Sequence, residues 1–191
     1  FYEKPSRDDL RHVFALMEQA GGSEPGFANA AEALRRAPWF RGFNPCAEIL
    51  LGDKSFCNLV ELVLFRFNGD LKALLRAAQI IARANYRQTC VWLDDGILQR
   101  SWHELNQFLR LCGVGVTGVV SWDGVDDPRA WAALRDHARI GAISMADDLG
   151  MPHPKAVTTI KPSGTKSKTL SLAGFECAEG IHKPLGRYIF N

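Results

Sequence analysis

The chain has 191 residues, of which 47% are hydrophobic and 23% are charged, a balance that excludes a disordered polypeptide and allows one substantial core. Its 23 basic and 21 acidic residues give a net charge of +2 and form no block of five or six like charges, so we expect no nucleic-acid or membrane partner. No apolar run reaches the roughly 20 residues that cross a bilayer. The five cysteines are an odd number with irregular spacing and no CxxC pair, which suggests neither a secreted disulfide framework nor a zinc site, so we expect a cytoplasmic protein in a reducing compartment.

Four segments have the apolar spacing and the terminal residues of helices. Asp127 followed by Pro128 predicts the clearest start, because aspartate caps the free N–H groups of a first turn and proline fits its first position. Ser101 and Glu104 have the spacing of a capping box, which predicts another start. The helices are expected at residues 6–20, at 70–85, from 101 onward and at 127–149, with Gly21, Gly22 and Gly150 as stop signals.

Short β-rich runs lie between these helices, at residues 57–64, 113–120 and 156–160. Helices that alternate with short strands, apolar on both faces, are typical of an α/β fold with a largely parallel sheet. The chain has no internal repeat and no linker composition. We therefore expect residues 1–191 to be one continuous part of a single, larger α/β domain.

Residues 113–118 read Gly-Val-Gly-Val-Thr-Gly, a literal G-x-G-x-x-G that would indicate an NAD-type dehydrogenase. In that class the motif follows a strand and opens a helix. Here a helical segment precedes it and the β-branched Val119 and Val120 continue it, so glycines that permit close packing within a strand are the favoured interpretation. Finding Gly115 in the middle of a strand would exclude the dehydrogenase.

A loop around Cys46 carries the first chemical signal. Glu48 follows two residues later in an Asn-Pro turn context, which places a potential base beside a thiol. Taken alone, this pattern is more often a packed loop cysteine next to a surface glutamate. Cys57 lies eleven residues downstream, and a turn at residues 52–53 would bring the two cysteines close. Two sulfurs and a carboxylate at one site fit thiol redox chemistry coupled to proton transfer.

A second signal begins where the β-rich run at residues 156–160 meets Pro162. The next residues form a small-residue turn rich in hydroxyl and backbone N–H groups, with two lysines nearby. Such a turn binds phosphate when a helix follows it. The spacing is not that of a Walker A loop, and in isolation an ordinary strand-to-loop turn is the commoner structure.

Together these segments resemble the adenosylcobalamin-dependent (class II) ribonucleotide reductases, in their ribonucleoside-triphosphate reductase branch. The resemblance rests on Asn-Pro-Cys-Ala-Glu-Ile followed by Ser-Phe-Cys-Asn-Leu, and on Pro-Ser-Gly-Thr. It implies part of a ten-stranded α/β barrel with the active-site cysteine on an internal finger loop. Because even an eight-stranded barrel takes roughly 250 residues, we expect this chain to be a fragment that is inactive alone.

The resemblance also implies a role for each matching residue. Cys46 would carry the thiyl radical, Glu48 would take the proton of the ribose 3′-hydroxyl, and Asn44 would hydrogen-bond the ribose hydroxyls. Cys57 would belong to the reducing dithiol, whose other cysteine lies outside this chain. The residues implied to bind substrate are Asn44, Pro45, Cys46, Ala47, Glu48, Pro162, Ser163, Gly164, Thr165 and Lys166.

The same resemblance implies a ribonucleotide substrate, adenosylcobalamin with most of its contacts outside this chain, and a thioredoxin-type or other dithiol reductant. The histidines have no paired metal spacing, so no metal site is expected. Two alternatives stay open: a reductase whose radical comes from a metal-containing subunit, and a non-catalytic nucleotide-binding relative. The joint presence of Cys46, Glu48 and Cys57 favours an enzyme, since binding alone needs none of them.

Overall fold

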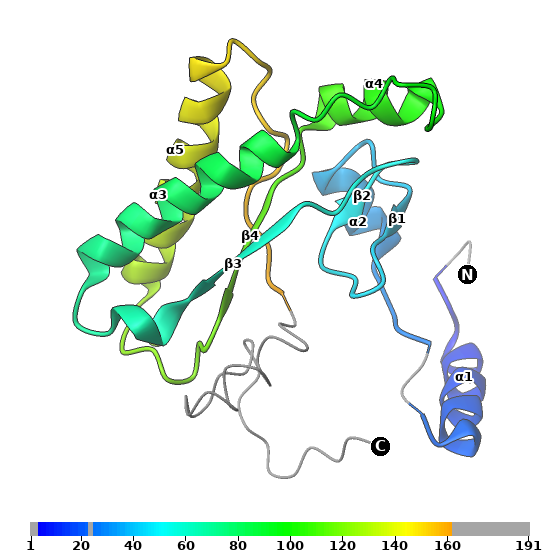
Figure 1. Ribbon diagram of the computed structural model, residues 1–191. Coiled ribbons are helices and arrows are strands. Elements are labelled where there is room, and N and C mark those ends of the chain that lie inside the picture. Colours follow the sequence, from blue (N-terminus) through cyan, green and yellow to red (C-terminus); the bar gives the residue numbers. More distant parts are fainter. Residues whose placement is uncertain (1–3, 23–24, 162–191) are drawn as a thin grey trace. The chain divides into compact units, whose positions relative to one another are not determined.

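The protein is described from a computed structural model, which defines residues 4–22 and 25–161 (Figure 1). Its packing divides the chain into two compact units, Phe1–Pro38 and Trp39–Asn191, and each is described by itself. A division by packing is not by itself a domain boundary, so the single partial domain over residues 1–191 stays a prediction.

The first unit contains α1 (Arg7–Ala20) and α2 (Ala30–Arg36). Helix α1 confirms the prediction: the Ser6 hydroxyl accepts a hydrogen bond from the Asp9 N–H at 3.1 Å, and the Asp9 carboxylate accepts one from the Ser6 N–H at 2.9 Å. Gly21 ends the helix with φ of 65°. The sequence analysis did not predict α2, because seven residues make barely two turns and give too short a pattern to recognise.

The second unit contains the sheet. Strands β1 (Gly42–Phe43) and β2 (Leu50–Leu51) form a short antiparallel pair. Strand β3 (Leu59–Val63) pairs in parallel with β4 (Gly113–Thr117), and Glu61 lies opposite Gly115. On its other edge β4 binds a third extended segment in parallel, with Val114 bridged to Thr158. The predicted parallel pairing is therefore confirmed, although each strand is shorter than its β-rich run.

Three further helices belong to this unit: α3 (Leu71–Gln88), α4 (Arg100–Leu109) and α5 (Pro128–Asp148). A 3-10 helix, η1 (Leu64–Phe67), leads from β3 toward α3. The Asp127 carboxylate accepts a hydrogen bond from the Arg129 N–H at 2.9 Å, which confirms the predicted start of α5. Helix α4 begins at Arg100, one residue earlier than predicted, and the predicted capping box does not form. Ser101 lies inside the first turn, and Glu104 instead accepts from the Arg100 guanidinium at 2.9 Å.

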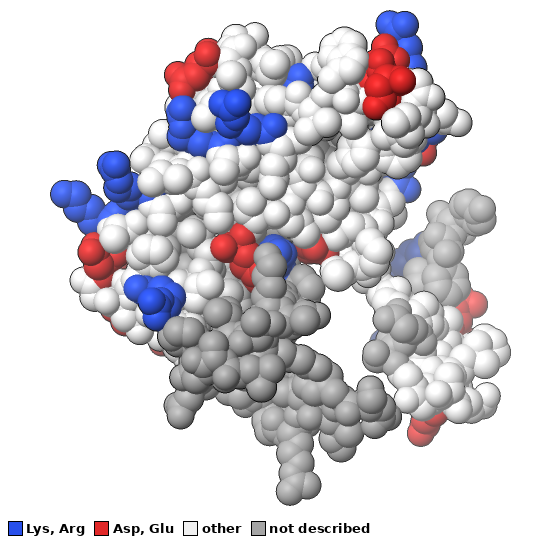
Figure 2. Space-filling view, viewed as in Figure 1, with Lys and Arg blue, Asp and Glu red and all other residues white. Residues whose placement is uncertain are grey.

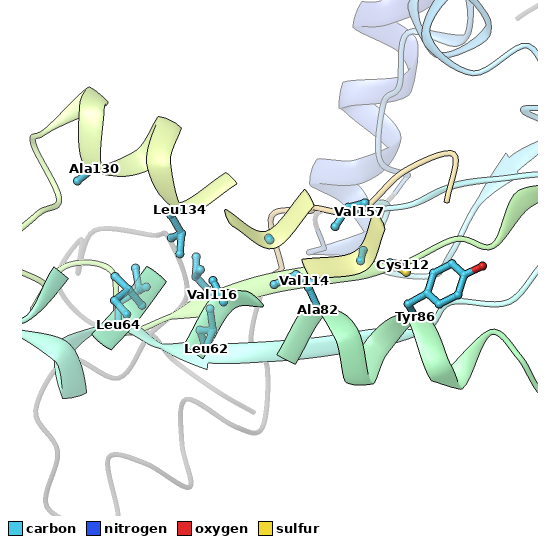
Figure 3. Packing of buried hydrophobic residues seen from close by; sticks show 14 of the residues in the cluster. Leu62, Leu64, Ala82, Tyr86, Cys112, Val114, Val116, Ala130, Leu134 and Val157 are labelled. Atoms are coloured by element: carbon cyan, nitrogen blue, oxygen red, sulfur yellow. The ribbon is translucent and has the colours of Figure 1, made fainter. Parts of the chain in front are cut away.

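Helices α3 and α5 pack against each other and share one apolar core with β3 and β4. Figure 3 shows Leu62, Val114 and Val116 of the strands in this core together with Leu134 of α5. The two helices approach closely at Gly141, where an added Cβ would lie 2.3 Å from the Gln79 carbonyl oxygen. The core therefore covers one face of the strands and leaves the other face to the loop between β1 and β2.

Charged side chains are dispersed on the face seen in Figure 2, where small groups of both signs are separated by uncharged surface. Ion pairs join residues three or four positions apart on helices α1, α2 and α4. Over residues 4–22 and 25–161, no helix combines the length and the apolar character needed to span a bilayer.

Candidate functional site

The loop between β1 and β2 turns sharply at residues 44–47. The Asn44 carbonyl oxygen accepts a hydrogen bond from the Ala47 N–H at 2.8 Å, which closes a β-turn with Pro45 at its second position. Ala47 has φ of 59°, in the left-handed region that non-glycine residues rarely adopt. This turn leaves Cys46 exposed at the tip of the loop.

The buried Asn44 side chain joins this loop to the segment before β3. Its Oδ1 accepts a hydrogen bond from the Ile49 N–H at 3.0 Å, and its Nδ2 donates one to the Cys57 Sγ at 3.4 Å. Because one planar amide makes both bonds, the loop and Cys57 have a fixed relation to each other. The structure thus brings Cys57 to the Cys46 loop, as the turn at residues 52–53 predicted.

Cys57 is an exposed free thiol in a negative environment. Partial burial of its sulfur raises the pKa, and the negative charge of Glu48 and the nearby Cys46 raise it further. The hydrogen bond from Asn44 and the positive charge of Lys161 oppose this effect on the pKa. The Cys57 thiol is therefore protonated at neutral pH, the form in which a thiol can give up both an electron and a proton.

Glu48 offers a buried acceptor. Its Oε2 atom is shielded from solvent and has no hydrogen-bond partner within the part of the chain that the structure describes. The Glu48 carbonyl oxygen accepts a hydrogen bond from the Thr159 hydroxyl at 2.8 Å, which ties the loop to the segment beside β4. A buried carboxylate oxygen without a partner is costly, and a hydroxyl brought by a ligand would relieve that cost.

A buried ion pair that the sequence did not predict contributes one of the charges that act on Cys57. Lys161 Nζ lies 3.2 Å from Glu61 Oε2, with side-chain exposures of 9% and 3%. The Lys161 side chain crosses β4 at Gly115, where an added Cβ would lie 2.5 Å from it. A carboxylate inside the apolar strand Leu-Val-Glu-Leu-Val and a glycine between two valines were the available signals.

The G-x-G-x-x-G segment is part of the sheet. Gly115 lies in the middle of β4, which excludes the dinucleotide-binding interpretation and confirms close packing within a strand. At Gly113 an added Cβ would lie 2.4 Å from the Leu59 side chain. The predicted phosphate-binding residues Pro162 to Lys166 lie outside the described residues. Residues 4–22 and 25–161 contain no group of three or more His, Cys, Asp or Glu side chains suited to a metal ion.

Asn44, Cys46, Glu48 and Cys57 thus meet at one place, and known structures contain a similar region. The chain resembles part of a ribonucleotide reductase. One matching crystal structure is that of a B12-dependent (class II) ribonucleotide reductase, with a TM-score of 0.63 and 26% sequence identity over 77% of this chain. The match supports a relationship to ribonucleotide reductases, while the triphosphate reductase branch, the ten-stranded barrel and the finger loop stay predictions.

The matched region is 23% of the reductase chain, so this chain spans less than a quarter of that enzyme. No model of a known protein family matches the chain. No curated protein sequence matches it either. The relationship to reductases therefore rests on the similarity in fold together with the residues of the loop.

Proposed function

We propose that this chain is part of the catalytic domain of a ribonucleotide reductase that acts on ribonucleoside triphosphates with adenosylcobalamin as radical source. The observation that carries the proposal is the meeting of two thiols and a buried carboxylate oxygen around Asn44, an oxygen that has no hydrogen-bond partner among the residues the structure describes. The similarity to a B12-dependent reductase supports it independently. A nucleotide-binding relative without activity has no use for this set of groups.

Cys46 and Glu48 act on the same sugar carbon in the proposed reaction. A thiyl radical on the exposed Cys46 takes the hydrogen atom from ribose C3′. The buried Glu48 Oε2 accepts the proton of the 3′-hydroxyl, and the desolvated carboxylate gains a hydrogen bond that no residue at positions 4–22 or 25–161 provides. Asn44 Nδ2 has two hydrogens, so it can bind a ribose hydroxyl while it still donates to Cys57.

Cys57 supplies one of the two thiols that reduce the 2′ position. In this step two thiols are oxidised to one disulfide, the ribose carbon gains a hydrogen, and the 2′-hydroxyl leaves as water. The second thiol belongs to a part of the enzyme beyond this chain. A thioredoxin-type dithiol in a cytoplasmic, reducing environment then restores the thiols by exchange, becoming a disulfide itself.

Adenosylcobalamin fits the described residues in one respect: the Cys46 thiol is exposed, so a cofactor bound on the outer side of the loop can reach it. The cofactor supplies the one-electron chemistry that starts the reaction. The residues around Cys46 hold the thiol at the turn and provide the base. The contacts to the cofactor are assigned to other parts of the enzyme.

The test uses the intact protein that contains this chain, with a ribonucleoside triphosphate, adenosylcobalamin and a dithiol reductant. Cys46→Ser should abolish deoxyribonucleotide formation and leave nucleotide binding unchanged. Cys90→Ser is the matched control, because Cys90 is half-buried beside Met151, away from the loop. Activity retained by Cys46→Ser would reject the role of Cys46.

The same assay separates the alternatives. Turnover with adenosylcobalamin and no second protein excludes a radical from a metal-containing subunit. Nucleotide binding without turnover under any of these conditions would favour the non-catalytic relative. The 191-residue chain alone should be inactive, and detectable turnover by it would contradict that prediction.

A further inference from the structure

The ion pair between Lys161 and Glu61 has no role in the reaction proposed above, although it lies close to the thiols. Both side chains are almost completely buried, and their charged atoms are 3.2 Å apart. A buried ion pair adds little net stability compared with an apolar pair of the same volume. Stability of the fold alone therefore does not account for a lysine at this position.

The surroundings of Lys161 fix the position of its charge. Gly115 leaves the space that the lysine stem occupies, since an added Cβ would lie 2.5 Å from the stem carbons. Glu61 holds the ammonium group at the far end. Two residues before Lys161, the Thr159 hydroxyl binds the Glu48 carbonyl oxygen at 2.8 Å, so the same segment contacts the catalytic loop.

Cys57 comes two residues before β3 and is held by the loop that contacts the segment of Lys161. Within β3, the Leu59 and Glu61 side chains share one face, because they are two residues apart in a strand. Leu59 packs at Gly113 and the Lys161 stem at Gly115 on that face. Thr159 binds the loop at the Glu48 carbonyl oxygen, and Asn44 of the loop binds the Cys57 sulfur. The lysine charge is therefore on the face of the sheet that the loop holding Cys57 contacts.

We propose that Lys161 is a positioning residue that stabilises negative charge on the Cys57 sulfur, and that Glu61 and Gly115 hold the lysine where it does so. The thiolate is the attacking and the leaving form of a cysteine in thiol–disulfide exchange. That the lysine charge helps to restore the dithiol rests on the proposed function. That Lys161 stabilises the Cys57 thiolate does not depend on the proposed function.

Several groups act on Cys57 besides the lysine. Glu48 and Cys46, both from the loop, oppose ionisation of the thiol, whereas the Asn44 amide favours it. Lys161 is the cation of this set, and its charge lowers the pKa of Cys57. The proposed mechanism needs the negative charge of Glu48, which opposes ionisation of Cys57. The fixed positive charge of Lys161 limits the free-energy cost of ionising the Cys57 thiol.

The test measures how fast Cys57 is alkylated in the full chain by iodoacetamide, a neutral reagent whose approach does not depend on local charge. Trypsin cleaves after Arg41, Lys54 and Arg66, so Cys46 and Cys57 fall in different peptides for mass spectrometry. Lys161→Met keeps the aliphatic stem and removes the charge. Between pH 7 and 8, it should slow alkylation of Cys57 about threefold and leave Cys90 unchanged.

Three further variants separate electrostatics from structure. Gly115→Ala displaces the lysine stem and keeps both charges, so it should also slow alkylation of Cys57. Lys155→Met removes a positive charge from an exposed side chain of the same segment, which contacts the Phe108 ring, and should change nothing. Glu61→Gln breaks the same ion pair but leaves the cation, so alkylation should not become slower.

A wild-type rate at Cys57 in both Lys161→Met and Gly115→Ala would overturn the proposal. So would equal slowing in Lys161→Met and Glu61→Gln, which would indicate a shared loss of structure. If circular dichroism shows that Glu61→Gln does not fold, the proposal is tested by comparing Cys57 alkylation rates: Lys161→Met and Gly115→Ala should be slower than Lys155→Met. The assay contains no nucleotide or cofactor, so a positive result would stand even if the intact protein failed to reduce ribonucleotides.

Discussion

The two faces of the β3–β4 sheet differ in almost every physical property. One face presents Val114 and Val116 to an apolar core formed with α3 and α5. The other presents Gly113 and Gly115, against which the Leu59 and Lys161 side chains pack. Because side chains alternate along a strand, a single five-residue segment serves both faces.

This difference shows that residues of β4 have different structural roles according to the face of the sheet on which they lie. The valines stabilise the fold by burying apolar surface, whereas the glycines leave space for a charged side chain and for the loop between β1 and β2. Substitutions on the helix-covered face should therefore change stability, and substitutions on the loop face should change the chemistry of the thiols. Four experiments test this division.

The largest effect is expected for Leu74→Ala in α3. Leu74 is fully buried in the core, so its truncation should lower the free energy of unfolding by about 3–4 kcal/mol. Ile80→Ala on the same helix is the matched control, because Ile80 is 57% exposed and should cost less than about 0.5 kcal/mol. Urea denaturation measures both, and equal losses would contradict the assignment of the core.

The second largest effect is expected in the reactivity of two cysteines, Cys112 in the core and Cys57 beside the loop. Burial raises the pKa of Cys112 to about 12, whereas Cys57 is exposed and its pKa is raised without such deep burial. At pH 8 we expect iodoacetamide to modify Cys57 at least roughly a hundredfold faster than Cys112. Both should react at similar rates in urea. Comparable rates in the folded chain would place Cys112 outside the core.

Gly141→Ala tests the contact between α3 and α5. Alanine normally stabilises a helix relative to glycine, but here its Cβ would lie 2.3 Å from the Gln79 carbonyl oxygen. The free energy of unfolding should therefore fall by about 1–3 kcal/mol, with the helices forced apart. Ile140→Ala, at the preceding and exposed position of α5, should be nearly neutral in the same denaturation experiment. Stabilisation by Gly141→Ala would disprove the close crossing.

The smallest effect on stability is expected for Asn44→Ala, which removes hydrogen bonds to Ile49 and Cys57 at a cost of about 1 kcal/mol. Because the Asn44 amide lowers the pKa of Cys57, its loss should raise that pKa and slow alkylation at pH 8. Asn68→Ala removes comparable bonds to Ser121 and Asp123, so it should cost similar stability and leave Cys57 unaffected. A Cys57 rate that Asn44→Ala does not change would contradict the bond between them.

The sequence predicted those features of the fold that are determined by residues close together along the chain. Helices α1, α3 and α5 follow from apolar spacing and, in α5, from the predicted cap Asp127. In the structure Ser6, Asp70 and Asp127 each accept a hydrogen bond from the first turn of their helix. The start of α4 was wrong because two overlapping patterns compete there, and the ion pair of Arg100 with Glu104 is the one that forms. Local patterns thus predict element type better than their ends.

The candidate site likewise has features that the sequence predicted and features that it did not. The proximity of Cys46 and Cys57 was predictable because a short turn joins them, and the roles of the four loop residues come from a family resemblance. The pair of Lys161 with Glu61 was not predictable, because it joins residues 100 positions apart and depends on the register of β3, β4 and the segment after Val157. Spacing along the chain contains no information about such a register.

The bond between Thr159 and the Glu48 carbonyl has a consequence for how the protein is made. The loop residues leave the ribosome long before their partner, which is 111 residues away, and at about 5–20 residues per second this delay is on the order of ten seconds. Contacts within the loop, such as Asn44 with Ile49, form early because their closure is local. The loop that contains Cys46 thus gains this contact only when the segment around Thr159 arrives, so a ribosome stalled before Thr159 would carry Cys46 on a loop that lacks one of its anchors.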